Sequence, residues 1–151
     1  MLLNLFNSSI YTSDIIDLEI AGREKPSAGN QNVETIYYDI CLHRGGFRVG
    51  ECDLRVGMNE ELYYAGNIGY RIYDGYRGNH YAYYAAKMLM NIAREKYKMD
   101  HMIITCSPDN IPSEKTLIRL GGHLEKTVDV PSWHWLYKRG ETVKNIYSFD
   151  L

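Results

Sequence analysis

Residues 68–82 read IGYRIYDGYRGNHYA, and this stretch decides the fold of the 151-residue chain. Up to Tyr73 it carries the β-branched and aromatic residues that are typical of a strand. A turn with Gly75 and Gly78 follows, and from Asn79 onward the apolar residues repeat with the period of a helix. The stretch is therefore predicted to be a strand that turns directly into a helix.

One long helix is predicted downstream, from Asn79 to Tyr97. Its apolar residues recur every three or four positions and form a stripe opposite Lys87, Arg94 and Lys98. The next segment, His101 to Cys106, is short, apolar and β-branched, as expected of a buried strand. A strand, a helix and a strand in this order predict a parallel strand pair with a right-handed crossover.

Three β-rich segments lie upstream, and the short turns between them predict an antiparallel meander. The segments are Val33 to His43, Phe47 to Val56 and Leu62 to Tyr73. A shorter strand is expected at Asp17 to Gly22, and the polar residues Arg23 to Asn32 are typical of a loop.

The last third of the chain is predicted to contain a second helix and further strands. The helix begins near Pro112 and ends at Gly121-Gly122. Strands are expected at Leu124 to Val130, His134 to Tyr137 and Asn145 to Phe149. The expected fold class is α+β, a largely antiparallel sheet with one parallel β-α-β step and flanking helices. Residues 1–151 are expected to form a single domain.

Composition limits the environment and the partners of the protein. A net charge of -2 provides no basic face for nucleic acid. The N-terminus MLLNLFNSSIYTSD lacks the features of a secretion signal, and no apolar run approaches the roughly 20 residues that span a bilayer. We therefore expect a soluble, cytoplasmic protein that binds neither nucleic acid nor membrane.

The cysteines and histidines do not predict a metal site or a disulfide framework. Cys41, Cys52 and Cys106 are an odd number at wide spacing, and the five histidines lack the helical spacing of zinc ligands. We expect reduced thiols and no metal.

The turn from Asp74 to Ala82 is a candidate anion site. The first N–H groups of a helix lack internal partners and carry the positive end of the helix dipole, so a phosphate can bind several of them. A plain strand-to-helix turn without any ligand is the alternative interpretation of these residues.

Three motifs in a fixed order extend this interpretation. The first motif is Arg-Gly-Asn-His-Tyr-Ala at residues 77–82, where the long helix is predicted to start. Its arginine lies three positions before His80, and its alanine lies two positions after it. The strand Gly66 to Ile72 precedes this motif, and Asn110-Ile111-Pro112-Ser113 with Leu117, Leu120 and Gly121 follows the next strand. Together they resemble the GNAT superfamily of N-acetyltransferases, in its ribosomal-protein and small-molecule branch, over about residues 33 to 137.

The resemblance implies an acyltransferase that uses acetyl-CoA. It implies transfer of the acetyl group to a primary amine of a small molecule or peptide, by direct attack in a ternary complex. The residues implied to bind the cofactor are the N–H groups of Arg77, Gly78, Asn79, His80, Tyr81 and Ala82 for the pyrophosphate, the backbone of Tyr70, Arg71 and Ile72 for the pantetheine arm, and Asn110 near the thiol.

Two positions depart from the family pattern. His80 stands where the pattern has its inner glycine, and we interpret it as tolerated if its ring turns outward. Leu117 stands where many members carry a tyrosine that protonates the departing thiolate. These departures motivate an alternative function, a degenerate acyl-CoA-binding regulatory module without turnover.

Catalytic candidates follow from the chemistry of amines. An alkylamine with a pKa of about 10.4 must lose a proton before it attacks, directly or through water. Glu51 and Asp53 lie on the strand before the cofactor strand, where one of them could point into the cleft. Tyr137 in the tail is a third candidate, with packing as its alternative role. The acceptor and the oligomeric state stay open, with a homodimer as one option.

Overall fold

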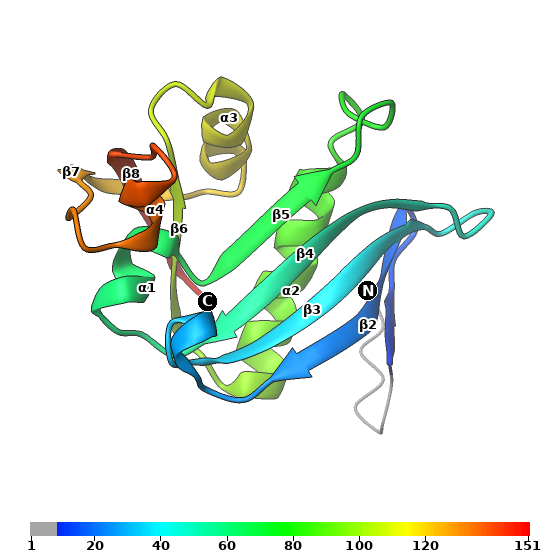
Figure 1. The fold of residues 1–151 in the computed structure, drawn as a ribbon. Helices are drawn as coiled ribbons and strands as arrows, with labels where there is room; N and C mark the ends of the chain where they lie inside the picture. The colour runs from blue at the N-terminus through cyan, green and yellow to red at the C-terminus, as the bar shows by residue number, and fades with distance from the viewer. Residues whose placement is uncertain (1–8) are drawn as a thin grey trace.

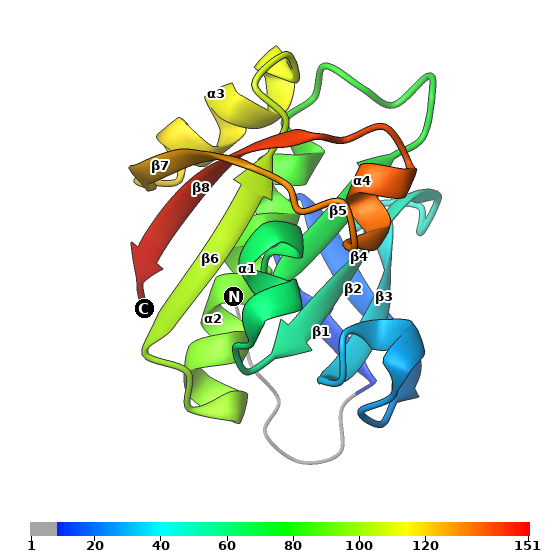
Figure 2. The same cartoon turned by 60° about the vertical axis from the view of Figure 1, so that its left-hand side comes forward.

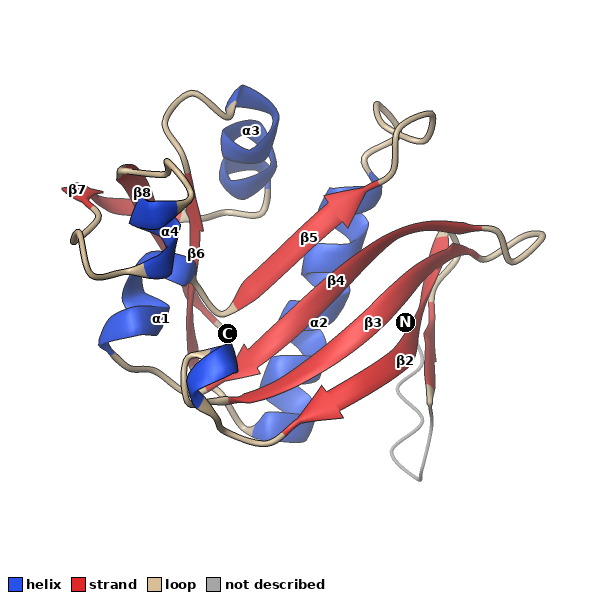
Figure 3. Cartoon of the chain, viewed as in Figure 1, coloured by secondary structure: helices blue, strands red, loops and turns tan. Residues whose placement is uncertain are grey.

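Five antiparallel strands form the larger of two sheets in the structure, a computed structural model that describes residues 9–151. They are neighbours in chain order: β1 (Ile10–Thr12), β2 (Ile16–Glu24), β3 (Glu34–Leu42), β4 (Arg48–Val56) and β5 (Ile68–Ile72). The predicted meander is thereby confirmed (Figures 1 and 3). Strand β2 extends two residues into the predicted loop, which otherwise contains a single 3-10 turn at Ala28–Asn30.

The long helix α2 (Tyr81–Tyr97) covers one face of this sheet and confirms the predicted helix (Figure 1). Its apolar stripe is buried against alternate strand residues such as Ile36 and Ile40, because side chains alternate between the two faces of a strand. The other face of β3 and β4 is open in Figure 1 apart from the 3-10 turn at one end of these strands. Because Cys52 and Leu54 of β4 are buried in the core, the alternating residues Glu51 and Asp53 lie on this open face.

A second sheet contains the remaining three strands that the structure describes. They are antiparallel and lie in the order β6 (His101–Cys106), β8 (Val143–Asp150) and β7 (His123–Asp129) (Figure 2). The strands predicted at 101–106, 124–130 and 145–149 are confirmed.

Strands β5 and β6 meet at one point, and Asn67 makes the junction. Its backbone N–H donates to the carbonyl of Ile103 at 2.7 Å, and its Oδ1 accepts from the N–H of Ile103 at 2.8 Å. Beyond this point the two strands separate toward α3 (Ile111–Arg119) (Figure 1). The α+β fold class and the β5-α2-β6 step are confirmed. Between β5 and β6, however, the structure has two hydrogen bonds at Asn67 in place of the expected ladder of parallel strand pairing.

The prediction of a strand beginning at Leu62 is wrong for its first half. Helix α1 (Glu60–Ala65) precedes β5. The side chain of Asn59 accepts a hydrogen bond from the N–H of Leu62 at 2.9 Å, and Gly66 ends the helix at a φ of 81°. Local capping therefore overrides the strand preference of the tyrosines in this segment.

The strand predicted at His134 to Tyr137 is also wrong. These residues form the short helix α4 (Trp135–Lys138), and Nδ1 of His134 accepts a hydrogen bond from the N–H of Leu136 at 3.1 Å. The second predicted helix is confirmed as α3, with Pro112 in its first turn.

The described residues test only part of the expectations about membrane, secretion and thiols. Every helix within residues 9–151 is too short or too polar to cross a bilayer. The stretch MLLNLFNSSIYTSD, on which the expectation about secretion rests, lies outside the described residues for its first eight positions. Cys41, Cys52 and Cys106 are free thiols.

Candidate functional site

The turn between β5 and α2 is held in shape by its own glycines and by one arginine. Gly75 and Gly78 have φ angles of 91° and 87°, a left-handed region that costs glycine little. The Nε of Arg77 donates to the carbonyl of Ile72 at 3.1 Å and ties the turn to the end of β5. The turn therefore presents a defined edge to the space beside it.

His80 immediately precedes α2 in a left-handed conformation, with φ 62° and ψ 20°. A residue with a Cβ atom adopts this region at a cost of about 1 kcal/mol, whereas glycine has no such steric cost. This difference is a physical reason for the glycine in the family pattern. Among the described residues no side chain caps α2, and its first turn contains no acidic residue. The first N–H groups of α2 are therefore suited to an anion.

The start of α3 lies across from this turn. Oδ1 of Asn110 accepts a hydrogen bond from the N–H of Ser113 at 3.3 Å and caps the helix. Oγ of Ser113 lies 2.8 Å from the hydroxyl of Tyr70 on β5. This contact joins α3 to β5 across the gap between the diverging strands.

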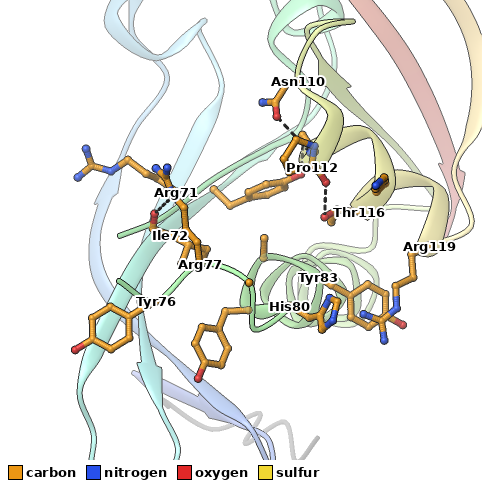
Figure 4. Close-up of a pocket in the computed structure, with 16 residues that line it drawn as sticks. Arg71, Ile72, Tyr76, Arg77, His80, Tyr83, Asn110, Pro112, Thr116 and Arg119 are labelled. Carbon is orange, nitrogen blue, oxygen red and sulfur yellow. Dashed lines mark hydrogen bonds between the residues drawn. The ribbon is translucent and has the colours of Figure 1, made fainter. Parts of the chain in front are cut away.

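A cavity of about 620 Å³ lies between β5, the turn, the start of α2 and α3 (Figure 4). It is lined by every residue predicted to bind the cofactor except Asn79, whose Nδ2 donates to the carbonyl of Tyr76 instead. The predicted residues on its wall are Tyr70, Arg71, Ile72, Arg77, Gly78, His80, Tyr81, Ala82 and Asn110. Three separate segments of the chain thus meet at one site.

The wall of this cavity is basic. Arg71, Arg77, Lys115 and Arg119 line it, and the described lining contains no Asp or Glu. In a chain whose net charge is -2, this concentration of positive charge favours a ligand with several negative charges. Together with the first turn of α2, it fits the phosphates of a nucleotide-containing cofactor.

Several of these lining residues were missed by the sequence analysis. Lys115, Thr116 and Arg119 follow Pro112 at intervals of three and four, so they share one face of α3. The guanidinium of Arg119 lies 4.0 Å from the ring centroid of Tyr83 on α2 and bridges the two helices. The helical spacing in the sequence indicates that these residues share a face. Which way that face points depends on how α3 packs against the rest of the molecule.

A second cavity, of about 360 Å³, contains both predicted bases, Glu51 and Asp53. Glu51 is paired with two arginines, at 3.1 Å from Nη2 of Arg71 and 3.2 Å from Nη2 of Arg48. Tyr70 and Arg71 line both cavities and therefore stand between them.

Asp53 is the more buried of the two carboxylates. Its Oδ2 accepts a hydrogen bond from Nε of Arg55 at 2.7 Å. Burial raises the pKa of Asp53, and the charge and hydrogen bond of Arg55 oppose this effect only in part, so the pKa lies above its ordinary value.

Tyr137, the third catalytic candidate, lies outside the described lining of both cavities, and so do His134 and Leu117. Tyr137 is partly exposed on α4. His134 is buried, and its Nε2 donates to the carbonyl of Glu61 at 2.9 Å, as a packed histidine does. Leu117 is fully buried in the core, so the position of the missing tyrosine holds no polar group.

Comparison with known proteins gives a family match over most of the chain. Residues 11–123 match the family model described as "Acetyltransferase (GNAT) domain". Among curated protein sequences, none matches the chain.

Solved structures with the same fold include three informative examples. An acetyltransferase from Agrobacterium tumefaciens is 23% identical with a TM-score of 0.57, over 76% of this chain and 60% of that one. The microcin C7 self-immunity acetyltransferase MccE, solved with acetyl-CoA and AMP, is 20% identical with a TM-score of 0.58, over 81% and 64%. A ribosomal-protein-S5-alanine acetyltransferase from Vibrio fischeri is 13% identical with a TM-score of 0.69, over 95% and 97%.

The extent of these matches differs. The chain spans 60% to 65% of the length of the first four similar structures, and nearly the whole length of the Vibrio fischeri protein.

Proposed function

Because the chain belongs to the GNAT acetyltransferase family, we propose that it is an N-acetyltransferase that transfers the acetyl group of acetyl-CoA to a primary amine. The transfer would proceed by direct attack of the amine in a ternary complex. The acceptor would be a small molecule or a peptide, and the protein would act in the cytoplasm.

The observation that carries the proposal is the basic cavity at the N-terminus of α2. Its volume of about 620 Å³ lies in the ordinary range of small-molecule sites. Among residues 9–151, four cationic side chains and no acidic one line it, and no side chain caps the start of α2, which supplies backbone donors. Coenzyme A, with a pyrophosphate and a further phosphate, suits this charge pattern.

The pantetheine arm would lie along β5. This strand is at the edge of its sheet, with β4 as its partner on the other side, so it can pair with an extended ligand as if with another strand. The N–H and carbonyl of Arg71 point toward β4, because Asn67 and Tyr73 bond that strand in the same alternation. The carbonyl of Ile72 already accepts a hydrogen bond from Arg77, which leaves the pairing to Tyr70 and to the N–H of Ile72. Asn110 would bind the arm near the thiol.

The acceptor would enter through the second cavity. There Glu51 and Asp53 are alternative bases for the ammonium proton, and Tyr70 and Arg71 separate them from the cofactor cavity. The raised pKa of Asp53 suits a base. However, the hydrogen bond from Arg55 occupies one of its two carboxylate oxygens. The exposed Glu51 can reach the acceptor without breaking a buried contact.

Similar structures support an amine acceptor of either kind. The Vibrio fischeri neighbour is named for a ribosomal protein and an alanine residue, and MccE for self-immunity to microcin C7. A panel of peptides, amino acids, polyamines and aminoglycosides therefore covers the proposed acceptors. Analytical ultracentrifugation would show whether the protein forms the homodimer that the proposal leaves open.

The proposal is tested by two measurements on the purified chain. Acetyl-CoA should raise the melting temperature, and free thiol should be released when a suitable amine from the panel is added. Glu51→Gln and Asp53→Asn should show which carboxylate is the base, because replacement of the base should lower kcat roughly 10²- to 10⁴-fold. Tyr137→Phe is included as the third candidate. No binding of acetyl-CoA would contradict the proposed function.

A second function, an acyl-CoA-binding module without turnover, is favoured by two observations. His80 adopts a left-handed conformation at the phosphate turn, and the buried Leu117 supplies no acid for the leaving thiolate. This alternative predicts stabilisation by acetyl-CoA, about 2.7 kcal/mol at a hundredfold excess over Kd, with no thiol release from any amine of the panel.

A further inference from the structure

The inner end of the cofactor cavity is the region where β5 and β6 converge. The strands join at Asn67 and separate toward α3. Of the β5 residues on the cavity wall, Tyr70 is the nearest to Asn67, about 10 Å along the strand from it at the usual rise per residue. The basic residues of α3 and the start of α2 lie toward the other end.

Tyr70 crosses this converging gap. Its hydroxyl lies 2.8 Å from Oγ of Ser113 at the start of α3, so the ring reaches from one sheet to the helix that follows the other. Burial raises the pKa of Tyr70, the hydrogen bond to Ser113 lowers it, and the nearby thiol of Cys106 at the end of β6 raises it. Tyr70 also packs against the hydrophobic core cluster that contains Cys106 at the end of β6.

If phosphates bind at the basic end, as the proposed function requires, the acyl end of the ligand must lie near Tyr70. A short acyl group would fit beside the ring there, whereas a longer chain would meet it. The hydrogen bond to Ser113 prevents the ring from swinging away. A partly buried side chain that is held at both ends is a harder wall than a flexible one.

We propose that Tyr70, held by Ser113, limits the acyl group of the bound thioester to a short chain. It is thus a residue that determines acyl-donor specificity, and the inference rests on the proposed function of the cavity as an acyl-CoA site. The role is steric and requires no proton transfer by Tyr70.

Calorimetric titration of the full chain with CoA, acetyl-CoA, butyryl-CoA and hexanoyl-CoA tests this without knowledge of the acceptor. The wild type should bind hexanoyl-CoA at least about tenfold more weakly than acetyl-CoA, a discrimination within reach of an apolar pocket. Tyr70→Ala should bring this ratio close to one. Ser113→Ala should give an intermediate ratio, because the ring remains but its tether is lost.

Tyr70→Leu keeps an apolar side chain in the gap and replaces the alanine variant if that one does not fold. Tyr63→Leu, on α1 and outside the described lining of both cavities, is the matched control and should keep the wild-type ratio.

The outcomes separate the two proposals. If CoA and acetyl-CoA bind but Tyr70 variants keep the wild-type ratio, or the wild type does not discriminate, the role of Tyr70 is overturned and the cofactor site stands. A wild-type ratio in Ser113→Ala would overturn the tether. If the wild type binds none of the four ligands, the proposed function itself fails.

Discussion

His80 is the residue at which the turn between β5 and α2 departs most clearly from a low-energy backbone. Its φ of 62° lies in the left-handed region, where a Cβ atom crowds the following carbonyl. The imidazole is exposed, so little packing offsets the cost.

His80→Gly should therefore stabilise the protein by up to about 1 kcal/mol, because glycine adopts this conformation without the steric cost. Urea denaturation measures the gain. Asn91→Gly within α2 is the control, and it should lose roughly 0.5 to 1 kcal/mol, since glycine weakens a helix interior. Equal losses in both variants would contradict the interpretation of His80.

Asp53 shows how one buried carboxylate makes stability depend on pH. Its pKa in the folded protein lies above the ordinary value of 3.8, chiefly through burial. The folded state therefore holds this proton more tightly than the unfolded state. The stability contributed by Asp53 is fully present below its ordinary pKa and is lost as the pH rises through the raised value.

Asp53→Asn should remove this loss, so the stability of the variant relative to the wild type should rise as the pH increases from below about 4 toward neutrality. Unfolding free energies from urea titrations at a series of pH values would show it. Asp109→Asn, at an exposed carboxylate, should show no such trend. A difference between Asp53→Asn and wild type that is constant with pH would refute the argument.

At the scale of elements, α3 contributes charge to the larger cavity as well as packing to the core. Leu117 is buried on one side of the helix, while Lys115 and Arg119 line the cavity on another. The charged face and the apolar face follow from the same 3.6-residue period.

Lys115→Ala should weaken binding of CoA by roughly two- to fivefold, as expected for an exposed ionic contact. The effect should shrink as salt is added, because salt screens exposed charges. Lys126→Ala on β7, exposed and outside the cavity, is the matched control. Titration calorimetry at low and high salt gives both values, and a loss that is the same at all salt concentrations would argue against a direct ionic role.

For the whole molecule, Asn67 holds the two sheets together. Its Nδ2 donates to the carbonyls of Arg55 and Gly57 at 3.0 and 2.7 Å, and its Oδ1 accepts from the N–H of Ile103. The side chain is fully buried, so these groups have no access to water as a substitute. The gap between β5 and β6 starts at this junction.

Asn67→Ala should destabilise the protein by roughly 3 kcal/mol, because it leaves buried backbone groups without partners. Chemical denaturation measures the loss. Asn91→Ala, which loses one contact to Arg94 at the surface of α2, should remain within about 0.5 kcal/mol of the wild type. If both variants behaved alike, the junction would not depend on this amide.

Much of the fold could be predicted from local patterns. The meander, α2, β6 and α3 were recognisable because hydrophobic period and turn residues act over a few positions. The two wrong segments, at Leu62 and at His134 to Tyr137, carry strand-favouring aromatic residues, but capping by Asn59 and His134 starts a short helix in each.

For the site, the sequence was sufficient to predict the glycine turn between β5 and α2, because glycines and a helix start are adjacent in the chain. The basic face of α3, the contact between Tyr70 and Ser113 and the split at Asn67 join residues that lie 36 or more positions apart. Such contacts depend on how the sheets and helices pack. The glycine turn that leads into α2 is thus a local property of residues 68–82, whereas the cavity beside it exists only because the tertiary structure separates β5 from β6 and places α3 across the gap.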